Sequence, residues 1–474
     1  MPELCDLSAV KMRRLIGAKT ISPVELLESC LARIAAVNPR LNAFTSMATE
    51  RARAEARAAE AAVLRGEPLP LLHGLPIGIK DLQETAGLRT TWGSPIFADH
   101  VPAEDEGVVA SVRRAGAVVV GKTNVPEFGA GANTNNPVFG PTGNPFDPTR
   151  ICGGSSGGSA VALATGMVPL ATGSDTGGSV RIPAAYCGVV GFRPSATLIP
   201  SEKRALGWNP LSTFGPMART VEDACLLLAA MAGHDPRDPL TSPVDAASFA
   251  APPPVDLSRL RVALSEDLGF APMDNAIRAL FRRRTEAFAS AFRTAERRDP
   301  SMAKANEAFE IMRAVAFLPR YRPLCDQYPD QVGPNIRANV AQGLGFSAAD
   351  VGWAHAEQTR IYREFLRLFQ EIDLLICPTN SVPPFPVEQL YPTHINGEPL
   401  RTYFHWLAPT YGLTLTAHPV AVIPCGLDHT GTPFGLQVCG PMGQDRFVLG
   451  AAAALEQLLA GTPELARPLP PIPG

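Results

Sequence analysis

Two stretches rich in glycine and serine decide how this chain is interpreted: GGSSGGSAVALA at residues 153–164 and GSDTGGSVRIP at residues 173–183. Both lie between apolar segments, at 161–170 and 182–190, whereas a flexible linker is exposed and polar on both sides. The first stretch predicts a loop that opens an alanine-rich helix, with free backbone N–H groups at the helix start. Because glycine permits close approach of the backbone, both loops can offer N–H groups to a developing oxyanion, and their serines are candidate nucleophiles.

Outward from these loops, short apolar runs predict strands that alternate with helices along the whole length. The strand candidates are 76–81, 117–120, 168–172, 261–264, 374–376 and 420–423, and the helix candidates include 22–37, with a capping box, 48–64, 220–232 and 354–371. This alternation indicates one layered α/β domain. A surface connection is predicted at 238–256 and a proline-rich loop at 379–392, which ends in a hairpin at Asn396-Gly397.

The composition excludes several classes of protein. The 42 Lys and Arg residues against 45 Asp and Glu give a net charge of −3, which rules out nucleic-acid binding through bulk positive charge. With 46% hydrophobic and 18% charged residues, the chain is a folded protein. No apolar run is long enough to span a membrane and the start of the sequence does not resemble a signal peptide, so we expect a cytoplasmic location without membrane attachment.

The nine cysteines and several short motifs point to no metal or cofactor. The cysteines are scattered without a C-x-x-C pair, which predicts buried, reduced thiols. Residues 116–123 match the phosphate-binding expression G-x-x-x-x-G-K-T, but three valines between the glycines predict a strand there. Residues 153–157 match the nucleophile elbow without a strand leading into it, and 301–304 match S-x-x-K without its partner motif. His418, in an apolar stretch, is predicted to be a core or loop histidine.

The run from residue 153 to 194 strongly resembles the amidase signature family, whose hallmarks are a G-G-S-S-G-G loop, then G-x-D-T-G-G-S-x-R-x-P, then C-G-x-x-G-x-[RK]-P. Further matching segments are 74–81, 121–128, 215–220, 373–379 and 435–437, so the resemblance covers nearly the whole chain. It implies an α/β fold with a large mixed β-sheet core covered by helices on both faces. Residues 1–474 would form a single amidase domain, with a helical layer at 1–65, the signature core at 72–220 and a substrate-shaping part at 257–474.

The resemblance also implies a Ser-cisSer-Lys triad. Ser179 aligns with the nucleophile, Ser155 with the bridging serine, held across a cis peptide bond, and Lys80 with the base. The oxyanion hole would consist of the backbone N–H groups of Thr176, Gly177, Gly178 and Ser179. Ser156 and Ser159 are then expected to be loop and helix-cap hydroxyls.

This assignment is coherent with elementary chemistry. A lysine acts as a base only when neutral, so Lys80 must be desolvated or lie near other positive charge. Its place at the end of an apolar strand would bury it, and strand alternation should direct Asp81 to the other face. No metal or organic cofactor is needed.

The substrate is expected to be a small-molecule amide. The family contains free-standing amidases for aliphatic, aryl or fatty-acyl amides, some of which also cleave esters or carbamates, and the glutamine-hydrolysing A subunit of a tRNA-dependent amidotransferase. We expect a free-standing enzyme for aryl or hydrophobic amides, with urethanes open; the alternative is the amidotransferase component. An apolar pocket is expected; a homodimer is compatible with the sequence. The predicted substrate-binding residues are Gly129, Ala130, Gly131, Phe139 and Phe317; Phe270, Met312 and Tyr321 are expected to line the pocket or to belong to the core.

Overall fold

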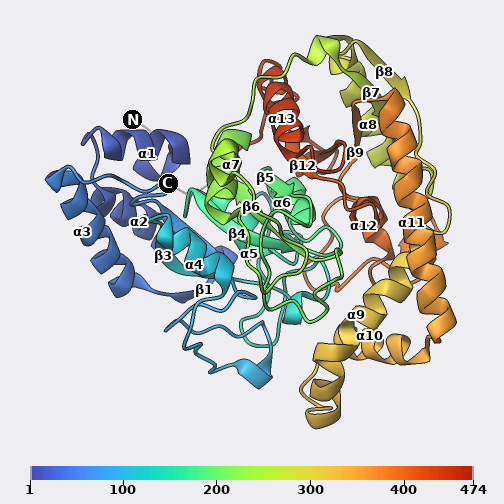
Figure 1. The fold of residues 1–474 in the computed structure, drawn as a ribbon, viewed down its shortest axis with the longest axis horizontal. Helices are drawn as coiled ribbons and strands as arrows, with labels where there is room; N and C mark the ends of the chain where they lie inside the picture. The colour runs from blue at the N-terminus through green and yellow to red at the C-terminus, as the bar shows by residue number, and fades with distance from the viewer. Residues whose placement is uncertain (1–2, 472–474) are drawn as a thin grey trace.

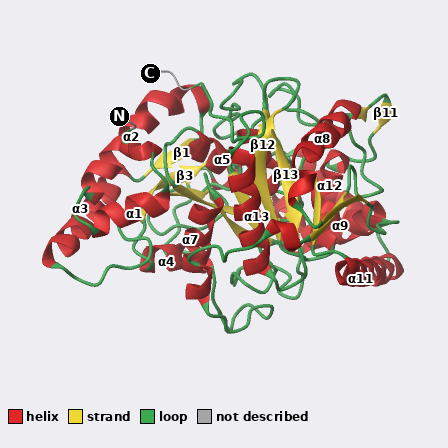
Figure 2. Ribbon diagram, turned by 90° about the horizontal axis from the view of Figure 1, so that it is seen from above, coloured by secondary structure: helices red, strands yellow, loops and turns green. Residues whose placement is uncertain are grey.

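The computed structural model describes residues 3–471, and its centre is a mixed sheet of eleven strands (Figures 1 and 2). From one edge to the other the strands are β1 (Phe44–Met47), β3 (Val118–Thr123), β2 (Pro76–Lys80), β4 (Leu170–Asp175), β6 (Thr213–Ala218), β5 (Val190–Arg193), β12 (Val420–Leu427), β13 (Pro433–Cys439), β9 (Leu374–Pro378), β7 (Arg261–Leu264) and β8 (Thr294–Arg297). Strand β2 runs parallel to β3 and β4, and β7 runs parallel to β8 and β9. The other neighbours are antiparallel, which confirms the predicted mixed sheet.

Helices cover both faces of this sheet. The α-helices of the described residues are α1 (Ala9–Gly17), α2 (Pro23–Leu41), α3 (Thr49–Arg65), α4 (Gly107–Arg114), α5 (Gly157–Ala164), α6 (Arg181–Cys187), α7 (Val221–Met231), α8 (Asn275–Phe288), α9 (Ala305–Gln327), α10 (Pro334–Gly345), α11 (Ala348–Glu371), α12 (Ala408–Leu415) and α13 (Asp445–Ala460). Successive strand residues face opposite layers: Val119 and Ile423 pack with α7 and α13, whereas Val118 and Val422 pack with α2, α5 and α6. The predicted two-sided covering is confirmed.

The predicted strands are all present, and all except β7 have at least one shifted end. The run at 168–172 is β4, which begins two residues later and continues to Asp175, and the run at 420–423 is β12, which continues to Leu427. Sequence patterns did not indicate β1, β5, β6, β8 or β13. Strand β6 contains Gly215 and Pro216, which disfavour strands, and β8 is an edge strand whose polar side chains give no apolar run.

Three local features that the sequence predicts are present in the structure. Ser22 and Glu25 form the capping box of α2. Strands β10 (His394–Ile395) and β11 (Glu398–Pro399) form the predicted hairpin, and Asn396 and Gly397 both adopt the positive φ that its tight turn requires. The match to a phosphate loop at 116–123 is strand β3, as expected.

Three further expectations concern the cysteines, His418 and a membrane-spanning helix. All nine cysteines are free and eight are buried, but Cys325, near the end of α9, is partly exposed, so the prediction of complete burial is wrong there. His418 lies in the core with Tyr362, Phe365 and Phe369 around its ring. Among residues 3–471, no helix has the length and apolar character that crossing a membrane requires.

Candidate active site

Lys80 is the last residue of β2, and its side chain is completely buried. Its Nζ lies 2.7 Å from Ser155 Oγ, 2.9 Å from Ser174 Oγ and 3.2 Å from the Ser174 carbonyl oxygen. Burial disfavours the charged amine and lowers the pKa of Lys80 to about 7, while the Asp175 carboxylate acts in the opposite direction. Near neutral pH a neutral amine can therefore accept a proton from the Ser155 hydroxyl. The contact with Ser174 was not predicted, although this residue stands in the second glycine-rich loop.

Asp81 follows Lys80 in sequence but belongs to a different polar group. Its carboxylate accepts hydrogen bonds from the Thr91 backbone N–H, at 3.2 Å, and from Thr91 Oγ1, at 2.6 Å. Burial raises the pKa of Asp81 to about 6, and the positive charge of Lys122 opposes that rise. The carboxylate that acts on Lys80 is Asp175 and not its neighbour in sequence, as strand alternation predicted.

Ser155 lies in the loop that leads into α5, and its peptide bond with Gly154 is cis, as the family resemblance implied. Its side chain is nearly buried. The loop and the first turn of α5 lie against the segment that follows β3: a Cβ on Gly158 would stand only 2.2 Å from the Asn124 backbone nitrogen. Glycine at this position allows the approach that holds Ser155 over the end of the sheet.

Two neighbouring serines have structural roles. Ser159 Oγ donates to the Thr172 carbonyl at 2.9 Å, which ties α5 to β4. The backbone N–H of Ser156 donates to the Ser179 carbonyl oxygen at 3.1 Å and so joins the two glycine-rich loops. Neither hydroxyl caps the helix, because α5 has no side-chain cap; the expectation of a helix-cap hydroxyl is wrong.

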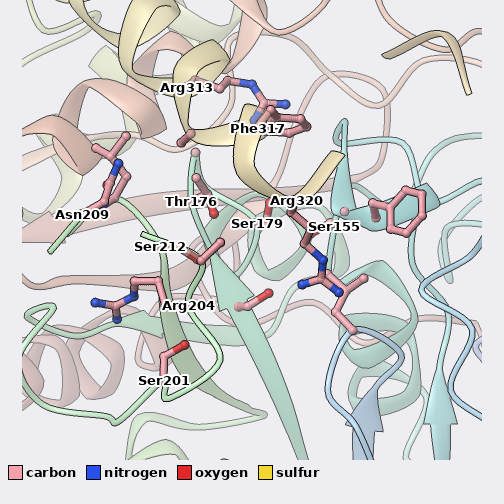
Figure 3. A pocket seen from close by; sticks show the side chains of 18 of the residues that line it. Ser155, Thr176, Ser179, Ser201, Arg204, Asn209, Ser212, Arg313, Phe317 and Arg320 are labelled. Carbon is pink, nitrogen blue, oxygen red and sulfur yellow. The ribbon is translucent and has the colours of Figure 1, made fainter. Parts of the chain in front are cut away.

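Ser179 lies four residues beyond the end of β4, and its side chain lines the same cavity as Ser155 (Figure 3). The structure thus brings Lys80 and Ser155 into direct contact and places Ser179 on the wall of the cavity that Ser155 borders. Within the described chain, no hydrogen bond joins the Ser155 and Ser179 hydroxyl groups. A neutral Lys80 amine has two N–H groups for the two Ser174 oxygens, so its lone pair can accept the Ser155 proton, which leaves a lone pair of Ser155 Oγ facing the cavity.

The turn before Ser179 presents free backbone donors. The N–H groups of Thr176, Gly177 and Ser179 have no hydrogen-bond partner in residues 3–471, and all three residues line the cavity. The fourth predicted donor differs: the Gly178 N–H donates to Asp175 Oδ1 at 2.9 Å and is not free. Three donors remain available for a negatively charged oxygen.

Asp175 anchors this turn through a buried network that the sequence did not reveal. Its carboxylate receives hydrogen bonds from Arg181 Nε at 3.0 Å, Arg181 Nη2 at 2.9 Å and Arg193 Nη1 at 3.2 Å, and all three side chains are fully buried. The pKa of Asp175 is held well below its usual range by the two guanidinium groups, against the effect of burial. Arg181 also donates to Gln437 at 2.8 Å and to Thr414 at 2.7 Å. The turn at residues 176–179, called the oxyanion turn below, is therefore fixed to β5, β13 and α12.

The cavity has a volume of about 250 Å³. Of the predicted substrate-binding residues, Gly129, Gly131 and Phe317 line it, and Tyr321 lines it as well. Ala130 and Phe139 are not among the lining residues. Ala130 is buried in the apolar cluster that also contains Phe317, behind the cavity lining, and Phe139 lies beneath the Arg89 guanidinium, with its ring centre 5.1 Å away, so the sequence placed these two residues wrongly.

Two further candidates belong to the core. Met312 is buried on α9, and Phe270 packs against Tyr411 with ring centroids 6.4 Å apart; neither lines the cavity.

The expectation of an apolar lining is wrong in part. Aromatic residues do line the cavity, but so do charged side chains: Glu84, Glu106, Lys203, Arg204, Arg313 and Arg320. Helix α9 contributes Arg313 and Arg320 from the same face as Phe317. Phe317 and Arg320 follow Arg313 by four and seven residues, and this helical spacing could have been noticed in the sequence. Nothing in the sequence shows, however, that this face meets the glycine-rich loops more than 120 residues earlier.

Comparison with known proteins gives consistent results. The family model described as Amidase matches residues 25–449. Among curated proteins, the A subunit of the glutamyl-tRNA(Gln) amidotransferase of Chloroflexus aurantiacus is 35% identical over 483 residues, which cover 97% of this chain and 98% of that protein. Among solved structures, a bacterial aryl acylamidase of the amidase signature family has a TM-score of 0.88 at 29% identity, covering 96% of each chain. The A subunit of the Thermotoga maritima glutamyl-tRNA(Gln) amidotransferase has a TM-score of 0.73 at 25% identity, covering 100% of this chain and 99% of that one.

Proposed function

The chain belongs to the amidase signature family, and from this premise we propose that it is a serine hydrolase that cleaves the C–N bond of carboxylic amides. The observation that carries the proposal is the Lys80–Ser155 contact of 2.7 Å at the edge of the cavity that Ser179 lines. A lysine whose pKa is about 7 is neutral in a large fraction of molecules at physiological pH. Three free N–H groups beside Ser179 supply the second requirement, stabilisation of an oxyanion.

The proposed reaction begins with a proton relay. Neutral Lys80 accepts the Ser155 proton as Ser155 accepts the proton of Ser179, and Ser179 Oγ adds to the amide carbonyl. The resulting oxyanion accepts hydrogen bonds from the N–H groups of Thr176, Gly177 and Ser179. The C–N bond then breaks while Ser155 returns a proton to the leaving nitrogen, which leaves the acyl group as an ester on Ser179. Water, deprotonated through the same relay, adds to this ester and releases the acid and the free serine.

We propose a free-standing amidase. The fold resembles that of the aryl acylamidase, with a TM-score of 0.88, more closely than that of the Thermotoga maritima amidotransferase subunit, with a TM-score of 0.73. In sequence, however, the Chloroflexus aurantiacus amidotransferase subunit is 35% identical to this chain, against 29% for the aryl acylamidase. The aromatic part of the cavity, formed by Phe128, Phe309, Phe317 and Tyr321, favours aryl or hydrophobic amides. Esters and carbamates, including urethanes, follow from the same acyl-enzyme chemistry because their leaving groups need less protonation.

The alternative is a glutamine-hydrolysing A subunit of a tRNA-dependent amidotransferase. Identity to such proteins over almost the full length favours it. In that case the chain would work with partner subunits, and glutamine would be its substrate.

A panel of substrates separates these functions. Purified protein is incubated with glutamine, aliphatic amides, anilides, esters and carbamates, with Ser179→Ala as the blank. We expect hydrolysis of anilides above the blank. Hydrolysis of glutamine alone would favour the amidotransferase function, and equal rates in the wild type and the blank would refute the proposed nucleophile.

Three sequence predictions remain predictions: the division into parts at 1–65, 72–220 and 257–474, a homodimer, and a cytoplasmic location. The first gains support from α9, which belongs to the third part and forms one wall of the cavity.

A further inference from the structure

Helix α9 turns one face toward the cavity, and that face carries Arg313, Phe317 and Arg320 (Figure 3). Residues separated by four and seven positions lie on the same side of a helix, and the backbone positions of the two arginines are about 10 Å apart along its axis. Both side chains line the cavity in which Ser155 and Ser179 lie.

Arg313 is buried without a counter-ion. Its exposed fraction is 8%, and its one hydrogen bond runs from Nη2 to the Tyr403 hydroxyl at 2.5 Å. The guanidinium lies 4.6 Å from the ring centre of Phe317 and 5.0 Å from that of Phe404, while Nε is buried and has no hydrogen-bond partner among residues 3–471. In the described part of the chain, no carboxylate lies within ion-pair distance of it. An arginine stays protonated at all physiological pH values, so this is a buried positive charge that lacks its partner.

Arg320 is a second positive charge without a counter-ion on this wall. Its guanidinium lies 5.5 Å from the ring centre of Trp92 and 5.8 Å from that of Tyr321. Residues 3–471 provide no ion-pair partner for it either. Arg320 is exposed, so its position near the mouth suits attraction of an anion more than tight binding.

The other charged side chains of the cavity are compensated. Lys203 pairs with Glu84, and Arg204 lies 3.6 Å from Asp238. Burial raises the pKa of Glu106 to about 7, so this carboxyl group is only partly ionised near neutral pH. The excess charge of the cavity is therefore positive and is concentrated on α9.

We propose that the preferred substrates are amides that carry a carboxylate, and that the Arg313 guanidinium binds this carboxylate. The proposal rests on the proposed amidase function and specifies its substrate class. The free edge of a guanidinium matches the two oxygens of a carboxylate, and the rings around Arg313 exclude water from the contact. Arg320 guides the anion inward.

The fold also sets the distance between the carboxylate and the reacting carbonyl. A Cβ on Gly177, in the oxyanion turn, would lie 3.3 Å from Phe309 Cζ, so Phe309 borders the site of reaction. Arg313 stands one helical turn further along α9, about 6 Å along the axis. That spacing fits a carboxylate separated from the amide by an aromatic ring or a short aliphatic chain, which would pack against Phe309 and Phe317.

Two matched pairs of substrates test the proposal with the wild-type enzyme. The 4-nitroanilide of succinic acid is compared with that of pentanoic acid, which places the charge on the acyl side. N-acetyl-4-aminobenzoate is compared with 4-methylacetanilide, which places it on the leaving group. We expect kcat/KM to be at least about tenfold higher for the charged member of one pair, the gain expected from a charge-assisted hydrogen bond.

Variants assign the preference to Arg313. Arg313→Gln should reduce the ratio of charged to neutral kcat/KM about 10- to 100-fold, mainly through KM. For Arg313→Lys this ratio should lie between those of Arg313→Gln and the wild type, because lysine keeps the positive charge but lacks the paired N–H donors of a guanidinium group. Arg322→Gln, the same change at an exposed arginine of α9 outside the cavity, should keep the wild-type ratio.

The possible failures are distinguishable. If the wild type hydrolyses none of the amides, the proposed function fails. If it hydrolyses the neutral members without preferring either charged member, or if both Arg313 variants keep the full preference, only the carboxylate proposal is overturned. The wild-type comparison and Arg313→Lys give a result even if Arg313→Gln does not fold.

Discussion

Lys80 can serve as a base because of where the chain places it. The strand 76–80 is apolar until its last residue, so the amine is carried into the core and loses its hydration. The burial of this residue could be predicted from the sequence, and its role followed from the family resemblance. The contact of its amine with Ser174 could not be predicted, because that residue is one of several similar hydroxyls in a loop without regular periodicity.

The first prediction concerns the pH dependence of turnover. The folded-state pKa of Lys80 is about 7, below its ordinary value near 10.4, and the neutral form is the active one. The rate should therefore rise about tenfold per pH unit well below pH 7, level off above it and persist at alkaline pH. We would measure kcat/KM for an anilide from pH 5 to 9, where a flat profile would contradict a lysine base. Lys80→Ala should lose about 1000-fold or more in kcat.

A second prediction concerns Gly129, whose φ is +72°. A Cβ there would lie 2.8 Å from Leu82 Cδ1 and 3.2 Å from Ser155 Oγ. Gly129→Ala should displace Ser155 and reduce kcat/KM about 100-fold, because small misplacements of catalytic groups are costly. Gly140→Ala is the matched control: its φ is +76°, but a Cβ there has no neighbour within 4 Å. Each change should lower the free energy of unfolding by about 1 kcal/mol, because alanine is strained at a positive φ. An equal loss of activity in both variants would contradict the proposed displacement of Ser155.

At the scale of elements, the ends of β4 and β5 and the start of α6 meet in the network of Asp175, Arg181 and Arg193. Its three charges are fully buried, so each depends on the others for compensation. The network fixes the turn that ends at Ser179 and also brings negative charge close to Lys80. It therefore influences both the donors for the oxyanion and the base.

Asp175→Asn tests this double role. Removing the carboxylate leaves two buried guanidinium groups without an anion and should lower the free energy of unfolding by about 3 kcal/mol or more. Asp175 raises the pKa of Lys80, so its loss should lower that pKa and move the acid limb of the remaining activity to lower pH. Asp445→Asn is the control, since Asp445, the first residue of α13, is a buried carboxylate that accepts hydrogen bonds from the backbone N–H and the hydroxyl of Ser195. It should reduce stability without moving the acid limb; an unmoved limb in Asp175→Asn would refute the electrostatic coupling.

Elements were predictable where local signals agree. The run 261–264 is strand β7 to the residue, and the capping box at Ser22 fixes the start of α2. Strand β6 was missed because Gly215 and Pro216 oppose a strand locally, yet the antiparallel neighbours β4 and β5 hold it in the sheet. Tertiary pairing overrides propensity in that case.

At the scale of the whole molecule, the cavity joins segments that are far apart in the sequence. Gly129 and Gly131 come from the loop after β3, the serines from the loops around β4, and the opposite wall from α9. The resemblance located the loops, because their motifs are contiguous. It could not locate the α9 wall or exclude Phe139, because those depend on how distant layers pack.

Phe317→Ala tests the contribution of that wall. Loss of the ring should raise KM and lower kcat/KM for an anilide about tenfold, with a smaller effect on acetamide, because only the aryl substrate packs against it. Phe139→Ala is the matched control, since this ring lies outside the cavity. Equal effects of the two changes on the ratio of anilide to acetamide would contradict the assignment of the wall.

In the proposed mechanism, Ser179 forms the acyl-enzyme. The most direct measurement is mass spectrometry of enzyme quenched during turnover of an activated ester, followed by mapping of the modified peptide. We expect one acyl group on Ser179 in the wild type and in Ser212→Ala, which changes a serine of the same cavity outside the proposed triad, and no acyl group in Ser179→Ala. An acyl group on another residue, or wild-type turnover by Ser179→Ala, would contradict it.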